Sequence, residues 1–169
     1  MAALFADNAD IGVIYGEGVH IDENDKVIEP YPTADFDQAA LRDRCFLCQP
    51  ATFFRRSLVT SHGGLRDNLR YCLDYEFWLR LAAAGVAFRR TGHLLAQSRM
   101  YAANKTMSQR VHAYFETADM LIRGFGYRDG HWAENFANAA ADLLEGQFAI
   151  PRAYTLREAR RLAHAAWTG

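Results

Sequence analysis

The sequence predicts an α/β domain followed by a helical C-terminal part. Up to about residue 106, short runs rich in β-branched residues alternate with helical patterns and with glycine and proline turns. Beyond that point the apolar periodicity is helical. Half of the 169 residues are apolar and 13% are aromatic, which is enough to build a packed core. We therefore expect an α/β region at 1–106 and an α-helical extension at 107–169.

The α/β region contains several short predicted strands. Asp10–Tyr15 is a β-branched run that is typical of a buried strand, and Gly16 and Gly18 are expected to interrupt it. The remaining predicted strands are Val19–Asp22 and Lys26–Ile28, which pair as a hairpin, and Val86–Phe88 and Leu94–Ala96. The apolar run Phe46–Phe54 ends at two arginines and precedes a turn at His62–Gly64.

The clearest helix is Asp74–Ala84. Asp74 is a favourable N-cap, Glu76 suits the first turn, and Gly85 is expected to end the helix. Its apolar residues Phe77, Trp78, Leu81 and Ala84 share one face. The other predicted helical segments are Met1–Asn8, Asp35–Arg42, Val111–Arg123, His131–Glu145 and Thr155–Ala166.

The overall charge argues against several classes of partner. The formal net charge is −1 and the pI is about 6.6, so there is no electrostatic footprint for nucleic acid. No apolar run reaches the ~18 residues that a transmembrane helix needs. The first eight residues lack the basic and apolar regions of a signal peptide, so we expect a cytoplasmic protein.

Three cysteines allow two interpretations. Cys45 and Cys48 form a C-x-x-C pair, and a zinc site would have to recruit Cys72 and His62. The segment before the pair is a poor strand, which disfavours a thioredoxin-like redox motif. The simpler interpretation is that these are buried thiols beside a core strand.

Asp74 is the leading candidate for chemistry. A carboxylate at a helix start is held rigidly, and a general base needs a fixed reach to a substrate hydroxyl. The alternative is that Asp74 only caps its helix. The segment Gln49–Arg56 combines amide, hydroxyl, aromatic and guanidinium groups that could bind a sugar and a phosphate. It could equally be a strand that leads into a helix with a solvated basic end.

A D-x-D pattern at Asp35 and Asp37 is the only candidate for a divalent metal site. Carboxylates suit hard cations, but this pair follows a proline-rich loop, and we favour solvated carboxylates at a helix start. We therefore predict no metal-binding residues in this chain. The sequence contains no Gly-rich phosphate loop, G-x-S-x-G or H-E-x-x-H motif, which leaves hydrolase and metalloprotease functions without support.

Taken together, several segments resemble the family 2 glycosyltransferases of the GT-A fold. The matching segments occur in order over roughly residues 1–106: 11–18, 21–23, 49–57, 64–65, 73–82, and Arg99 with Asn104–Thr106. The blocks Q-P-A-T-F-F-R-R and D-Y-E-F-W-L-R-L are specific together, although neither is alone. The resemblance implies part of a GT-A, Rossmann-like domain with a mixed sheet of few strands.

The resemblance also implies a reaction and roles for residues. Asp74 would act as the base that deprotonates an acceptor hydroxyl, which attacks the anomeric carbon of a nucleotide sugar with inversion. Acceptor or substrate binding would involve Gln49, Thr52, Arg55, Arg80 and Arg99. The implied partners are a nucleotide-sugar donor and a glycan or lipid-linked acceptor, and the complete enzyme of this family would use Mg²⁺ or Mn²⁺.

The chain departs from the family pattern in two places. Met1–Phe5 resembles the helix that follows the family's metal-binding D-x-D, so we expect this chain to lack the nucleotide-binding half and to need no metal by itself. Met100 and Tyr101 follow Arg99 where the family often has a histidine. An incomplete sheet would expose an edge through which the chain could self-associate. The alternative function is a non-catalytic fragment that acts as a binding or assembly module.

Overall fold

The computed structural model describes residues 1–100, 109–127, 130–148, 156–157 and 160–161. The chain divides into two compact units. The first unit comprises Met1–Arg66 and Leu73–Ala102, and the second comprises Asp67–Cys72 and Ala103–Gly169. The short segment Asp67–Cys72 therefore groups with the C-terminal helices, although it lies between two parts of the first unit in the sequence.

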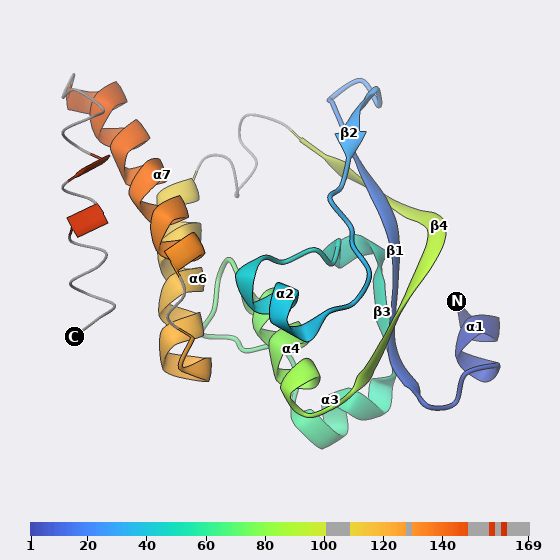
Figure 1. Ribbon diagram of the computed structural model, residues 1–169. Helices are drawn as coiled ribbons and strands as arrows, with labels where there is room; N and C mark the ends of the chain where they lie inside the picture. Colours follow the sequence, from blue (N-terminus) through green and yellow to red (C-terminus); the bar gives the residue numbers. More distant parts are fainter. Residues whose placement is uncertain (101–108, 128–129, 149–155, 158–159, 162–169) are drawn as a thin grey trace. The chain divides into compact units, whose positions relative to one another are not determined.

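The first unit is built on a four-stranded mixed sheet with β1 (Ile11–Ile21) at its centre. Strand β4 (Ala87–Arg99) runs parallel to β1 along one edge. Strands β2 (Val27–Pro30) and β3 (Thr52–Phe54) pair antiparallel with the two ends of the other edge (Figure 1). The predicted α/β class and the mixed sheet of few strands are confirmed.

Strand β1 continues through the glycines that were expected to interrupt it. A Cβ on Gly16 would lie 2.5 Å from the Leu95 Cδ1 atom and 2.6 Å from the His93 carbonyl oxygen. A Cβ on Gly18 would lie 2.5 Å from the Cys48 sulfur. These glycines therefore allow neighbouring segments to approach the strand closely, which is a second use of glycine in strands besides ending them.

The hairpin prediction is confirmed, and β4 is longer than predicted. Strands β1 and β2 pair from Val19 opposite Pro30 to Ile21 opposite Val27. The two short strands predicted at Val86–Phe88 and Leu94–Ala96 are parts of the single strand β4. The register of pairing between β4 and β1 shifts at several places. Strand β4 nevertheless continues through Gly92 as one strand.

The helices of the first unit are α1 (Ala2–Ala6), α2 (Gln38–Asp43), α3 (Arg56–His62) and α4 (Leu73–Ala83). Helix α4 begins one residue earlier than predicted, so Asp74 lies in the first turn and is not the N-cap. Gly85 ends the helix as predicted, in a left-handed conformation with φ of 75°. The predicted face is only partly correct, because Ala84 is exposed whereas Tyr75, Glu76 and Leu79 are also buried.

The core of the first unit lies between the sheet and α4. Val13, Ile14 and Tyr15 of β1 are fully buried, as are Phe77 and Leu81 of α4. The loop before β3 adds Phe46, Leu47 and Cys48, and α2 adds Leu41. The Tyr75 hydroxyl donates to the backbone carbonyls of Leu41 and Arg42 and so connects α4 to α2.

The second unit contains the predicted helix pair α6 (Arg110–Phe125) and α7 (Gly130–Phe148). Their aromatic side chains meet, with Tyr114 against Trp132 and Phe115 against Phe136. The predicted helix Thr155–Ala166 lies largely outside the described residues, as does Asn104–Thr106. No helix among the described residues is long and apolar enough to cross a membrane.

Candidate functional site

Asp74 is held in the first turn of α4 with a half-buried carboxylate. One of its oxygens accepts a hydrogen bond of 2.9 Å from the Tyr75 backbone N–H. Burial raises the pKa of this carboxyl, and hydrogen bonds from the backbone amides of Tyr75 and of Asp74 itself offset only part of that rise. Among the described residues, no basic side chain forms an ion pair with Asp74.

The loop that carries the two vicinal cysteines lies within electrostatic range of Asp74. Burial raises the pKa of the Cys45 thiol, and the Asp74 carboxylate raises it further. Burial also raises the pKa of Tyr31, to which Cys45, Cys48 and Asp74 add. The Tyr31 hydroxyl donates to the Cys45 carbonyl at 3.3 Å. Asp74 therefore lies within electrostatic range of Cys45 and Tyr31, whose raised pKa values keep both groups neutral near neutral pH.

Two predicted binding residues follow this loop, and Thr52 is the first residue of β3. Gln49 follows Cys48 directly and has an exposed side chain. The Thr52 hydroxyl donates to the Cys48 carbonyl at 2.8 Å, so its oxygen keeps its lone pairs for a further donor. Gln49 and Thr52 stay predictions as binding residues, and their side chains have hydrogen-bonding capacity to spare.

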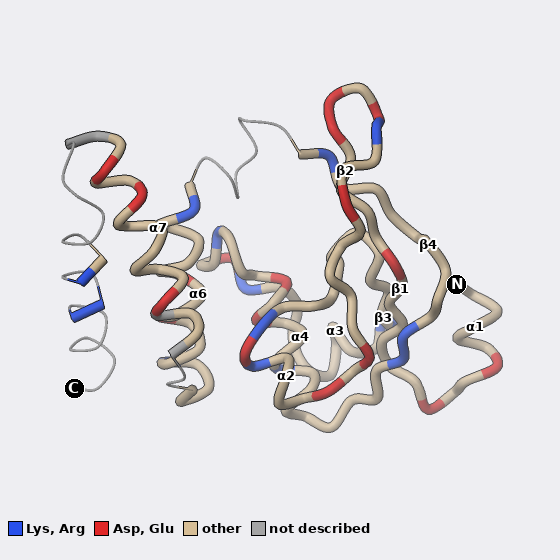
Figure 2. The backbone as a smooth tube through the Cα atoms, turned by 45° about the horizontal axis from the view of Figure 1, so that its top comes forward, with Lys and Arg blue, Asp and Glu red and all other residues tan. Residues whose placement is uncertain are grey.

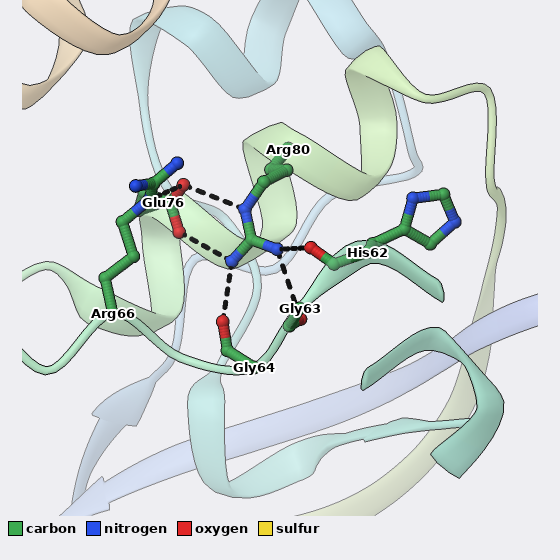
Figure 3. A network of polar contacts seen from close by, with 6 residues as sticks. All are labelled: His62, Gly63, Gly64, Arg66, Glu76 and Arg80. Carbon is green, nitrogen blue, oxygen red and sulfur yellow. Dashed lines mark hydrogen bonds and ion pairs between the residues drawn. The ribbon is translucent and has the colours of Figure 1, made fainter. Parts of the chain in front are cut away.

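Arg80 has a structural set of partners that uses its whole guanidinium group (Figure 3). Its Nε and Nη2 atoms each donate to a Glu76 carboxylate oxygen at 2.9 Å. Nη2 also donates to the Gly64 carbonyl at 2.8 Å, and Nη1 donates to the carbonyls of His62 and Gly63. All five N–H donors of Arg80 are thus engaged. They fasten the end of α3 to α4 and leave none for an acceptor sugar.

Glu76 is the centre of this network and was not among the predicted site residues. Its side chain is buried, and Arg66 donates to it at 2.7 Å from the other side (Figure 3). Burial alone would raise the pKa of Glu76, but hydrogen bonds from Arg80 and Arg66 outweigh it and hold this pKa below its ordinary value. The i,i+4 spacing of Glu76 and Arg80 was a sequence signal for half of the network.

Arg55 also has a structural environment. Its guanidinium donates to the carbonyls of Phe5, Asn8 and Ile11 at 2.7 to 2.9 Å, and it lies 5.0 Å from the centre of the Phe5 ring. These contacts tie the end of α1 and the start of β1 to the residue that follows β3. Its predicted role in substrate binding has no support in this geometry.

Arg99 lies at the far end of the sheet, beside the turn of the β1–β2 hairpin. It donates to the Asp22 carbonyl at 2.8 Å and to the Asp25 carboxylate at 2.5 Å. The acidic residues of this turn are visible beside β2 in Figure 2. Arg99 thus contacts the hairpin turn through its guanidinium, and its predicted role in substrate binding remains a prediction.

The D-x-D residues have separate partners. The Asp35 carboxylate is 3.0 Å from Arg90 Nη1, and Asp37 caps α2 by accepting the Ala40 N–H at 2.7 Å. The described residues contain no cluster of three or more His, Cys, Asp or Glu side chains that could hold a metal ion. Asp35 and Asp37 therefore have structural partners of their own, and the use of Mg²⁺ or Mn²⁺ by the complete family enzyme stays a prediction.

All three cysteines are free thiols, and two of them are buried. Cys48 lies against Gly18 of β1, which agrees with the expectation of thiols beside a core strand. Burial raises the pKa of Cys48, so this thiol stays protonated and unreactive near neutral pH.

The comparisons with known proteins add no assignment to this geometry. No protein-family model matches the sequence, and no curated protein matches it either.

Proposed function

We propose that this chain provides the acceptor side of a nucleotide-sugar glycosyltransferase, with Asp74 as the general base. The observation that carries the proposal is the state of the Asp74 carboxylate. It is half-buried, its pKa is raised by burial, and its hydrogen bonds come from backbone amides. A carboxylate that is not neutralised by a cation and has a raised pKa accepts a proton more readily than an ordinary aspartate.

The proposed reaction needs one proton transfer and one displacement. The Asp74 carboxylate takes the proton of an acceptor hydroxyl as that oxygen attacks the anomeric carbon of the donor sugar. The bond between the anomeric carbon and the diphosphate oxygen breaks, and the nucleoside diphosphate leaves with the bonding electrons. Attack from the side opposite the leaving group inverts the anomeric centre.

Gln49 and Thr52 are the proposed contacts to the acceptor sugar. An exposed amide can donate and accept at once, and a hydroxyl whose proton is committed still accepts from a sugar hydroxyl. The predicted cationic contacts fit less well, because Arg55 and Arg80 each bind three backbone carbonyls. We therefore restrict the proposed acceptor site to Asp74, Gln49 and Thr52.

The proposal is tested first by acceptor binding. Monosaccharides and short oligosaccharides would be titrated into the isotopically labelled 169-residue chain and followed by NMR. We expect at least one sugar to shift the Gln49 side-chain amide and the Asp74 carboxyl together. Gln49→Ala should weaken that binding, whereas Gln97→Ala, an exposed glutamine on β4, should not. Sugars that leave both groups unchanged would refute the acceptor-site proposal.

A calorimetric titration of donors addresses the other half of the reaction. UDP- and GDP-sugars would be added with Mg²⁺ or Mn²⁺, and the sequence analysis predicts no binding to this chain alone. Metal-dependent binding would show that the nucleotide site is present, and Asp35 and Asp37 would become the first residues to replace.

A second candidate function is a sugar-binding or assembly module without catalysis. The structural contacts of Arg55 and Arg80 favour this second function. Both guanidinium groups bind backbone carbonyls, so neither is assigned to stabilise a leaving diphosphate. The two functions are separated by Asp74→Asn. The substitution should abolish transfer but leave the affinity of a pure binding module nearly unchanged.

A further inference from the structure

We propose that Glu116, on α6, is a positioning residue for Asp74, which it restrains through the backbone of residues 70–72. This inference rests on the proposed role of Asp74. Glu116 does not itself touch a substrate in this proposal. It fixes the backbone of the segment that leads directly into α4.

The first observation is the way in which Glu116 binds three successive backbone amides. Its Oε1 atom accepts hydrogen bonds from the N–H groups of Tyr71 at 2.6 Å and Cys72 at 3.0 Å. The Arg70 N–H donates to both carboxylate oxygens, at 3.0 and 2.9 Å. A single carboxylate therefore holds three consecutive residues, which end two positions before Asp74.

The second observation is that other contacts hold the same segment. The Tyr71 hydroxyl donates to the Gln109 side-chain oxygen, and the Tyr71 ring stacks against His112 at 6.5 Å between centroids. The Cys72 thiol also lies 3.4 Å from Glu116 Oε1. These contacts explain why Asp67–Cys72 groups with the C-terminal helices and not with α4.

Electrostatics favours the same arrangement. Burial would raise the pKa of Glu116, but the amides of Tyr71, Arg70 and Cys72 outweigh it and hold this pKa below its ordinary value. Glu116 therefore stays ionised near neutral pH, and hydrogen bonds to an ionised acceptor are about twice as strong as neutral ones. On the other side of the segment, Arg66 is held by Glu76 of α4. Only three residues, 67–69, separate Arg66 from the amides that Glu116 holds, which leaves little freedom to the segment that leads into α4.

The consequence concerns the environment of Asp74. Its carboxylate depends on burial for its raised pKa, and burial depends on where the first turn of α4 lies. If the amides of residues 70–72 lose their anchor, the first turn gains freedom and water reaches the carboxylate. The pKa of Asp74 should then fall toward its ordinary value.

Two variants of the full chain test this proposal. Glu116→Gln removes the charge, and Glu116→Asp keeps the charge but draws the carboxylate back by one methylene. The second variant matters, because loss of a negative charge could by itself lower the pKa of Asp74. The control is Asp119→Asn, on the same helix, whose carboxylate pairs with Arg123 in an exposed i,i+4 contact.

Two measurements are made on each variant. Amide hydrogen exchange of Arg70, Tyr71 and Cys72 should become roughly tenfold faster or more in both Glu116 variants. NMR titration of the Asp74 carboxyl should show a lower pKa in both variants and no change in the control. Thermal unfolding of each variant verifies that the fold is retained.

The proposal fails if these amides exchange faster in the Glu116 variants but the pKa of Asp74 is the same as in the wild type. It also fails if exchange at residues 70–72 is unchanged. Neither readout needs transferase activity, so a failure of the proposed function leaves this test intact. If transfer is observed, the acidic limb of its pH profile should move to lower pH in both Glu116 variants, in step with the pKa of Asp74.

Discussion

At the scale of single residues, the two carboxylates of α4 show how environment shifts the pKa of neighbouring acids in opposite directions. Glu76 is buried between two guanidinium groups, which hold its pKa below its ordinary value. Asp74 lies two residues earlier with only amide hydrogen bonds, and burial raises its pKa. The Glu76 carboxylate is committed to holding a loop, whereas the Asp74 carboxylate is available to accept a proton.

Replacement of Asp74 should therefore reduce activity and spare stability. When the chain is completed by a nucleotide-binding half, transfer in Asp74→Asn should fall by at least about 100-fold, which is the lower range for loss of a general base. The free energy of unfolding should stay unchanged or rise, because a carboxylate that burial destabilises becomes a neutral amide. The measurements are initial rates of transfer and urea-induced unfolding. Asp35→Asn is the matched control, because Asp35 is an exposed aspartate paired with Arg90; equal loss of activity in both variants would contradict the assignment.

Replacement of Arg80 should show the opposite pattern. Arg80→Lys retains the charge but cannot reproduce five donors in a plane, so the carbonyls of residues 62–64 and buried Glu76 lose partners. We expect the free energy of unfolding to fall by about 2–3 kcal/mol. Urea unfolding measures it, with Arg56→Lys, an exposed arginine at the start of α3, as the control. A difference of less than about 0.5 kcal/mol between the two variants would exclude the structural role.

At the scale of elements, close packing against β1 explains both its length and its glycines. The His93 carbonyl oxygen and Leu95 lie where a side chain on Gly16 would be. A backbone oxygen cannot rotate away as a side chain can, so strand and neighbour would have to separate. The sheet therefore depends on glycine at this position for reasons of space.

Gly16→Ala should destabilise the first unit by about 1–3 kcal/mol, the usual cost of overpacking. The matched control is Gly92→Ala in β4, because nothing lies within 4 Å of the Cβ that it would add. The two variants make the same chemical change in neighbouring strands and differ in available space. Thermal unfolding of both proteins measures the difference, and equal melting temperatures would show that the sheet adjusts without cost.

Local sequence patterns predicted which helices and strands form better than they predicted where those elements end or which residues they contact. The α/β class, the hairpin and helices α4, α6 and α7 followed from periodicity and turn residues. The continuity of strands β1 and β4 did not follow from the sequence. A glycine that allows a neighbouring segment to approach closely cannot be distinguished, by sequence alone, from a glycine that ends a strand. The roles of Arg55 and Glu116 depend on carbonyls and amides about 45 residues away or more, and main-chain partners leave no signature in a sequence.

At the scale of the whole molecule, the carboxylates whose pKa values are shifted by the fold determine how stability responds to acid. Glu76 and Glu116 have folded-state pKa values below the ordinary value, so they stabilise the protein above the ordinary Glu pKa of about 4.3. That contribution is lost as the pH falls through their folded-state values. Asp74 has the opposite sign, because its contribution is present in acid and is lost as the pH rises through its raised folded-state pKa.

Since hydrogen bonds lower the pKa of Glu76 in the first unit and of Glu116 in the second, we expect the free energy of unfolding to decrease as the pH falls below about 4.3. Urea unfolding across the acidic range measures this slope. Glu116→Gln should have a lower stability near neutral pH and a shallower dependence on acid, because one titrating group is removed. Asp74→Asn should make the dependence steeper, because the opposing contribution of Asp74 is gone. A protein that gains stability throughout this acidic range would show that Asp74, and not the two glutamates, dominates the linkage.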